Sequence, residues 1–156
     1  MAFEVEFTNE QVSKMLTDMN RRVDDFKHKR KPVLGLLSAN IFADIMEHFQ
    51  HETGETSRWK KWSDSYDKAM KARGRGGNKI LQDSGRLRQT FKPTSYRVMG
   101  DGVMWYNNAK TKDGAPYAYY HNEGGKKLPK REFMWLSQRA MSKIESELLQ
   151  FIAEGK

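Results

Sequence analysis

The sequence predicts an α+β fold in which a small antiparallel β-sheet is flanked by N-terminal and C-terminal helices. Apolar residues recur at helical spacing near both ends of the chain, within residues 8–51 and again within 133–153. Between them, two short alternating segments are joined by a turn that contains glycines. With 156 residues and no internal repeats, the chain is expected to form a single domain over 1–156.

Within this domain the sequence indicates four successive segments. They are an N-terminal strand with two helices over 1–51, a basic aromatic segment with a glycine-rich loop over 52–79, a β-rich middle over 80–132, and a C-terminal helix over 133–153. The hydrophobic fraction of 37% and the mean hydropathy of -0.87 are low for a globular protein, but 12% aromatic residues argue against general disorder. We therefore expect a modest core, with other parts covered by solvent or by partner proteins.

The first segment begins with an alternating pattern and continues with an apolar stripe. In residues 3–7, phenylalanine and valine alternate with glutamate, which predicts a short strand. Thr8 and Gln11 have the spacing of a capping box, so a helix is expected to begin there and to run to about His28. Its apolar face consists of Val12, Met15, Leu16, Met19, Val23 and Phe26.

A second helix is expected to begin at Pro32, because proline fits the first turn of a helix. Apolar residues continue at helical spacing as far as Phe49. Asn40 and Asp44 interrupt the stripe, so we expect this face of the helix to be buried less completely. The helix should end at Thr53-Gly54.

The next segment combines aromatic and basic residues. Trp59, Trp62 and Tyr66 lie at helical spacing and predict a short amphipathic helix capped by Ser57 or Ser63. Aromatic side chains at this spacing usually face a core or a neighbouring subunit, although basic residues interleaved with aromatics can also stack on single-stranded nucleic acid.

Positive charge is concentrated in one part of the chain. The net charge is +8, and residues 58–92 alone carry eleven basic and three acidic side chains. This part includes a glycine-rich loop over residues 73–78, which is expected to be mobile unless a partner holds it. Such a segment can contact nucleic acid phosphates, an acidic protein surface, or solvent alone.

The middle of the chain predicts short elements joined by turns. Asp83 or Ser84 can cap a helical turn through Leu87. Thr94–Val98 and Val103–Tyr106 predict a β-hairpin, because two glycines in the connection permit positive φ.

Three further elements are expected after the hairpin. Lys110–Pro116 predicts a loop, and Tyr117–Asn122 a helical turn that ends at Gly124. The final helix is expected to run from about Phe133 to Ala153.

Composition also bears on the compartment. There are no cysteines, so disulfides and thiolate metal sites are excluded. No apolar run approaches the roughly 20 residues of a membrane span, and the N-terminal residues lack the pattern of a signal peptide. Folding in the cytoplasm, without contact with a membrane, is the expectation.

No pattern in the sequence predicts catalysis. His48 and His51 could share a metal ion, but no third ligand is evident. The glycine-rich loop before Lys79 lacks the order of a phosphate-binding loop. His121 has no serine, cysteine or carboxylate obviously placed to form a triad with it. We therefore predict no catalytic residue, no metal site and no cofactor.

A family resemblance rests on four motifs that match in order and spacing. The motifs are Arg58-Trp59 with Tyr66, Ile80-Leu81-x-Asp83-Ser84-Gly85-x-Leu87, Tyr117-Ala118-x-x-His121-x-x-Gly124, and Leu128-Pro129-x-Arg131-x-Phe133. Together they resemble the phage virion morphogenesis (tail completion) family, which includes the Mu-type G protein. The resemblance covers about residues 55–153, and the first 50 residues carry no matching motif. Asn122 stands where glutamine is usual, and Glu132 where proline is frequent.

The resemblance implies a structural virion protein of a tailed phage or prophage that completes the tail and joins it to the head. It implies a ring, commonly six-fold, at the head-proximal end of the tail or in the neck, and a fold like that of other neck and tail-completion proteins. The expected partners are further copies of the chain, neck or connector proteins, tail terminator or tail tube proteins, and DNA in the channel. The expected location is the virion, and the host cytoplasm during assembly.

The resemblance also suggests roles for single residues. Gly85 would permit the turn between the short helix and the strand, and Leu87 would anchor that joint in the core. Tyr117, His121 and Gly124 would shape a loop at an interface with another subunit or partner.

The remaining motif residues would position the last helix. Pro129, Arg131 and Phe133 would dock its start. The cations expected to face DNA or an acidic partner ring are Lys71, Arg73, Arg75 and Lys79.

Two other classes of function stay open at this point. One is a basic nucleic-acid-binding module that uses residues 58–92. The other is an enzyme such as a nuclease, although that segment contains only three scattered acidic residues for metal binding.

Overall fold

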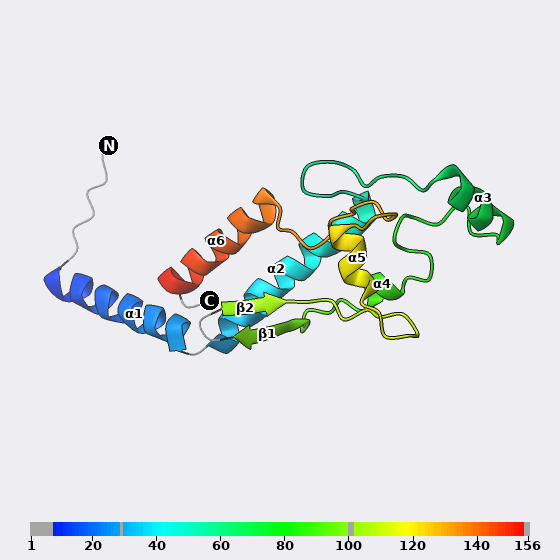
Figure 1. Ribbon diagram of the computed structural model, residues 1–156. Helices are drawn as coiled ribbons and strands as arrows, with labels where there is room; N and C mark the ends of the chain where they lie inside the picture. Colours follow the sequence, from blue (N-terminus) through cyan, green and yellow to red (C-terminus); the bar gives the residue numbers. More distant parts are fainter. Residues whose placement is uncertain (1–7, 29, 100–101, 155–156) are drawn as a thin grey trace, which may run out of the picture.

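The structure of the protein is a computed structural model that describes residues 8–28, 30–99 and 102–154. The described part is mostly helical and contains one small antiparallel sheet (Figure 1). α1 and α6 contact each other and both contact α2, so the N-terminal and C-terminal helices lie together. The predicted strand over residues 3–7 lies outside the described residues. The three long helices are α1 (Asn9–His28), α2 (Arg30–His51) and α6 (Gln138–Glu154).

The capping box predicted at the start of α1 is confirmed. The backbone N–H of Thr8 donates to Gln11 Oε1 at 2.9 Å, and the N–H of Gln11 donates to Thr8 Oγ1 at 3.2 Å. These reciprocal bonds satisfy two N–H groups that no helical carbonyl can reach. The helix therefore begins where the local sequence predicts.

Within the described side chains, the apolar stripe of α1 is half-buried only in the second half of the helix. Met15 and Leu16 are 58% and 56% exposed, and Val12 is exposed as well, whereas Met19 and Val23 are half-buried. In the second half, Arg22 donates to the carbonyl of Ile152 at 3.2 Å, at the C-terminal end of α6. Because the contact with α6 is made there, the first half of α1 presents its apolar face to solvent.

α2 contributes the largest share of the core. Ile41, Ile45 and Phe49 are buried along it. The expectation that Asn40 and Asp44 mark a less buried face is wrong, because both are buried beside α6. Asn40 donates a hydrogen bond to Glu147 on α6, and Asp44 accepts one from Ser137 just before α6. These bonds offset most of the free-energy cost of burying the two polar side chains.

Aromatic rings fill the end of the core near the C-terminus of α2. Phe49 and Phe133 are fully buried, with ring centroids 5.3 Å apart. Trp59 packs edge-on against Phe49 at 5.5 Å, and Phe91 packs against Phe133 at 5.8 Å. Trp59 thus belongs to the core.

The sheet is a single hairpin. β1 (Tyr96–Met99) pairs with β2 (Gly102–Trp105) in antiparallel register, with Tyr96 opposite Trp105. The predicted hairpin is therefore confirmed, with its turn lying partly outside the described residues. Residues 80–132 are less rich in β-structure than predicted, because β1 and β2 are the strands described there. The rest of this segment, as far as the structure describes it, forms loops, two short helices, α4 (Arg86–Gln89) and α5 (Tyr117–Glu123), and an isolated β-bridge between Gly125 and Leu128.

The short helix predicted in the basic aromatic segment is present, and of its two predicted caps the structure shows Ser63. α3 (Asp64–Ala72) begins after Ser63, whose hydroxyl accepts a hydrogen bond from the N–H of Tyr66. Trp59 and Trp62 precede this helix. The glycine-rich loop that follows is held by its own chain, because Arg75 contacts both carboxylate oxygens of Asp83 at 3.1 Å.

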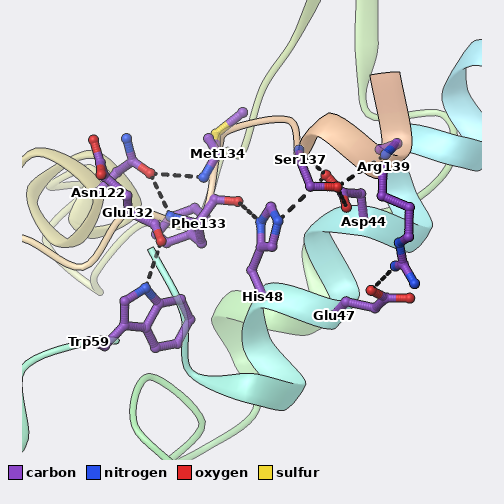
Figure 2. Close-up of polar contacts among 11 residues, drawn as sticks. Asp44, Glu47, His48, Trp59, Asn122, Glu132, Phe133, Met134, Ser137 and Arg139 are labelled. Carbon is purple, nitrogen blue, oxygen red and sulfur yellow. Dashed lines mark hydrogen bonds and ion pairs between the residues drawn. The ribbon is translucent and has the colours of Figure 1, made fainter. Parts of the chain in front are cut away.

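The final helix begins at Gln138 and not near Phe133 (Figure 2). Ser137 caps it, since its hydroxyl accepts from the N–H of Ala140 at 3.1 Å. Asp44 on α2 in turn accepts from both the N–H and the hydroxyl of Ser137, at 2.8 and 2.6 Å. A partner on another helix therefore sets this boundary, and apolar spacing could not predict it.

Candidate interaction groove

Several motif residues line one open groove with a volume of about 720 Å³. Its walls come from the residues before and within α3, from α4, from α5 and from the loop that follows α5. The aromatic, apolar and histidine or arginine side chains of its lining include Trp62, Tyr66, Leu87, Tyr117, His121, Pro129 and Arg131. Residues far apart in the sequence thus form one surface.

Arg131 joins three walls of the groove. Its Nε donates to the carbonyl of Lys60 at 3.0 Å and its guanidinium reaches the carbonyl of Lys61 at 3.4 Å. Its own N–H donates to the carbonyl of His121 at 2.9 Å. Burial lowers the pKa of Arg131, but an arginine keeps its charge in a protein. The groove therefore has a fixed positive charge at its base.

His121 and Tyr117 form an aromatic wall beside this charge. Their rings meet edge-to-face at 6.2 Å. Burial and the neighbouring charge of Arg131 lower the pKa of His121 from its ordinary 6.5, so the imidazole is neutral at pH 7. Its Nδ1 is buried without a hydrogen-bond partner among the described residues. Burial also raises the pKa of Tyr117.

Two glycines shape the backbone around the groove. Gly124 ends α5 with a φ of 81°, and a Cβ there would lie 3.0 Å from the backbone nitrogen of Lys130. Gly85 has a φ of 69° and precedes α4. The expected turn from helix to strand at Gly85 is therefore misplaced, because this glycine begins the short helix. Leu87, two residues further on, is buried.

The last motif lies in an irregular segment before α6, so its residues do not form the start of that helix. Phe133 enters the core, whereas Pro129 and Arg131 line the groove. Asn122 holds this segment in place, since its Oδ1 accepts from the N–H groups of Phe133 and Met134 at 3.0 Å each (Figure 2). Sequence reasoning did not assign this role to Asn122, although a glutamine at this position would also supply an amide oxygen.

Comparison with protein families decides the classification. The model of the phage virion morphogenesis family matches residues 7–153. The chain belongs to the phage virion morphogenesis family. The match includes residues 7–50, where no motif could be recognised, so the family model covers α1 and α2 as well. A search of curated proteins and a search of solved structures each gave no match.

Other properties of this family member concern membranes and metals. No helix within residues 8–28, 30–99 and 102–154 is long and apolar enough to cross a membrane. The same residues contain no group of three His, Cys, Asp or Glu side chains placed to hold a metal ion. His48 is buried against Trp135, at 4.0 Å between ring centroids, whereas His51 is exposed.

The four cations expected to face DNA or a partner are not gathered on the groove. Lys71 forms an ion pair with Asp67 at 2.6 Å, and Lys79 donates to the carbonyl of Gln50 at 2.7 Å. Arg75 is paired with Asp83, as described above, and Arg73 is exposed just after α3. The exposed lysines that do line the groove are Lys60, Lys61, Lys126 and Lys127. The sequence signal for these groove lysines is their occurrence as two Lys-Lys pairs. One pair follows Trp59 and the other precedes Leu128.

A serine, an aspartate and a histidine meet where α2 joins α6, but they do not form a nucleophilic triad (Figure 2). Ser137 donates its hydroxyl hydrogen to Asp44, and His48 Nδ1 lies 3.0 Å from the carbonyl oxygen of Phe133. His48 Nε2 lies 3.5 Å from Asp44 Oδ2. Because the serine is bonded to the carboxylate and not to the imidazole, no base activates it. The cluster holds the start of α6 on α2.

Proposed function

We propose that this protein is a structural component of a tailed phage or prophage virion that completes the tail and joins it to the head. In this proposal it assembles as a ring at the head-proximal end of the tail or in the neck, and it has no enzymatic activity. Membership of the phage virion morphogenesis family supports the proposal.

One observation carries the functional part of the proposal. The motif residues Leu87, Tyr117, His121, Pro129 and Arg131 converge on one open groove that is both basic and aromatic. The neutral imidazole there has no nucleophile bonded to it among the described residues, whereas Arg131 and Asn122 serve to hold backbone segments in position. A rigid, partly apolar groove with fixed charge suits binding to a protein surface.

Self-association is supported by the exposed apolar side chains of the two terminal helices. Val12, Met15 and Leu16 on α1, and Met141 and Leu149 on α6, are exposed in the isolated chain. Contact between copies would remove this apolar surface from water.

The proposal is tested by head–tail joining in a lysate that lacks this protein and accumulates separate heads and tails. Addition of the wild-type protein should restore joined particles, counted by electron microscopy, and infectivity. A groove variant, Tyr66→Ala with Lys127→Ala, should lose most of this activity while keeping its thermal unfolding temperature. The matched control is Tyr119→Ala with Lys112→Ala, whose side chains are exposed and do not line the groove. Full activity of the groove variant would contradict the proposal.

The second candidate is a basic nucleic-acid-binding module. It is favoured by the excess of eight positive charges in residues 58–92. The intramolecular contacts of Lys71, Arg75 and Lys79 reduce the number of cations available for phosphates. A salt-dependent mobility shift of duplex DNA by the purified protein would favour this candidate, with binding weakening steeply between 50 and roughly 200 mM salt.

A further inference from the structure

The groove has the properties expected of a site for an acidic and apolar peptide. Its rim carries Lys60, Lys61, Lys126 and Lys127, and Arg131 lies at its base. Its acidic residue, Asp83, is already paired with Arg75. Trp62 and Leu128 also line the groove and are half-buried. A volume of about 720 Å³ is within the range of about 300–1,000 Å³ of sites that enclose a drug-sized ligand, so several peptide side chains would fit.

This chain contains a segment of the matching chemistry. Residues 3–7 read Phe-Glu-Val-Glu-Phe, and Glu10 follows, with no lysine or arginine before Lys14. In an extended peptide, alternate side chains point to opposite sides, so the two glutamates would share one side and the three apolar side chains the other. The lysines of the groove complement the glutamate side of this peptide, and the aromatic and aliphatic side chains of the groove complement its apolar side.

We propose that the groove of one copy binds residues 3–7 of a second copy. This inference rests on the proposed ring and deepens it, because it names the segment that joins neighbouring subunits. Both parts of the contact belong to this chain.

A copy cannot fill its own groove with this segment. The groove lies beyond the C-terminal end of α2, where Lys79 and Gln82 bond the carbonyls of Gln50 and Phe49. α1 lies at the other end of α2 and points away from α3 (Figure 1). The 22 residues of α2 span roughly 33 Å, whereas seven extended residues span at most about 25 Å. The occupant must therefore come from another molecule.

A contact between two different surfaces of the same chain has a consequence for assembly. Such head-to-tail contacts form a closed ring when the rotation between neighbours divides a full turn, and open filaments otherwise. The exposed apolar face of α1 directly follows residues 3–7, so docking of the segment would bring Val12 and Leu16 close to the neighbouring copy. Docking of residues 3–7 would therefore cover both the groove and the exposed apolar face of α1.

The test uses charge reversal in the full chain. One variant carries Glu4→Lys and Glu6→Lys, and a second carries Lys126→Glu and Lys127→Glu. The matched control is Lys110→Glu with Lys112→Glu, because these lysines are exposed and do not line the groove. Particle mass is measured by light scattering across protein concentrations at low salt.

We expect each reversal to weaken self-association roughly ten-fold, because like charges would face each other, and the control to associate as the wild type does. Mixing the two reversed variants, or combining all four substitutions in one chain, should restore association. Unchanged association in either variant, or absence of rescue, would overturn the inference and leave the proposed function standing.

A peptide experiment separates this inference from the ring itself. A fluorescent peptide of residues 3–10 should bind the wild-type protein and should bind the Lys126→Glu, Lys127→Glu variant roughly ten-fold more weakly. A wild-type protein that stays monomeric at all concentrations would contradict both the proposed ring and this inference. In a wild-type protein that assembles, absence of peptide binding, or displacement of the peptide by DNA with higher affinity, would overturn this inference and leave the ring standing.

Discussion

Arg131 donates a hydrogen bond from Nε to the carbonyl of Lys60 at 3.0 Å across 71 positions of sequence. The same side chain reaches the carbonyl of Lys61, and its backbone bonds His121. One buried guanidinium thus fixes three segments of the groove relative to one another.

Replacement of Arg131 by alanine should destabilise the protein by about 2–3 kcal/mol, because the carbonyls of Lys60 and Lys61 would lose charged donors. Urea unfolding followed by tryptophan fluorescence measures this change. Lys130→Ala is the control, since Lys130 is exposed and its removal should change stability little. Equal effects of the two substitutions would contradict the assigned role of Arg131.

Replacement of Gly124 by alanine should cost about 1–3 kcal/mol, since its φ is 81° and the new Cβ would lie 3.0 Å from the nitrogen of Lys130. Gly125→Ala is the matched control. A Cβ at that position would lie 4.0 Å from the Cβ of Leu128, an ordinary contact. The measurement is the free energy of unfolding of the Gly124→Ala and Gly125→Ala variants. Equal values would show that the backbone at residue 124 adjusts to a Cβ without cost.

Replacement of Asp44 by alanine should destabilise the protein by about 3 kcal/mol, because both donors of Ser137 would lose their acceptor inside the protein. Glu47→Ala, on the same helix as Asp44, removes an exposed ion pair with Arg139 of α6 and should cost about 0.5 kcal/mol. Hydrogen exchange of the first turn of α6 should accelerate in the Asp44 variant alone. Unchanged exchange there would contradict the capping role.

Acidification should reveal the burial of His121. Its pKa in the folded protein lies below the ordinary 6.5, so the unfolded chain binds the proton more readily. The contribution of His121 to stability is therefore complete above about pH 6.5 and falls as the pH drops from there towards the folded-state pKa. The wild-type protein should lose more unfolding free energy between pH 7.5 and about 5 than His121→Gln does. His51→Gln, at an exposed position, should behave as the wild type.

Replacement of Leu16 by glutamate should impair assembly without unfolding the subunit. Because Leu16 is 56% exposed, the stability of the isolated chain should change by no more than about 0.5 kcal/mol. Ser13→Glu, which adds the same charge to an exposed position of the same helix, is the control. Light scattering should show smaller particles for the Leu16 variant only. Normal assembly of that variant would exclude the first half of α1 from the subunit contact.

Local patterns predicted the elements whose bonds lie within a few residues. The capping box of Thr8 and Gln11 closes over three positions, and the hairpin strands pair across a short turn. Gly124 ends α5 through its own backbone conformation. The order and spacing of the motifs were also sufficient to recognise the family, because they are properties of the chain itself.

The tertiary structure decided what depends on distant partners. The start of α6 depends on Asp44, which lies 93 positions before Ser137. The burial of Asn40, predicted to lie on a less buried face, depends on Glu147. The groove likewise depends on contacts between distant segments, among them those by which Arg131 links residues 60–61 to α5. Spacing along a chain reports which side chains share a face of one helix or strand, but a contact between elements depends on how whole surfaces pack. For this reason the sequence was sufficient for the family, the capping box of α1 and the hairpin, whereas the folded chain alone shows where α6 begins, where the basic groove lies and which lysines surround it.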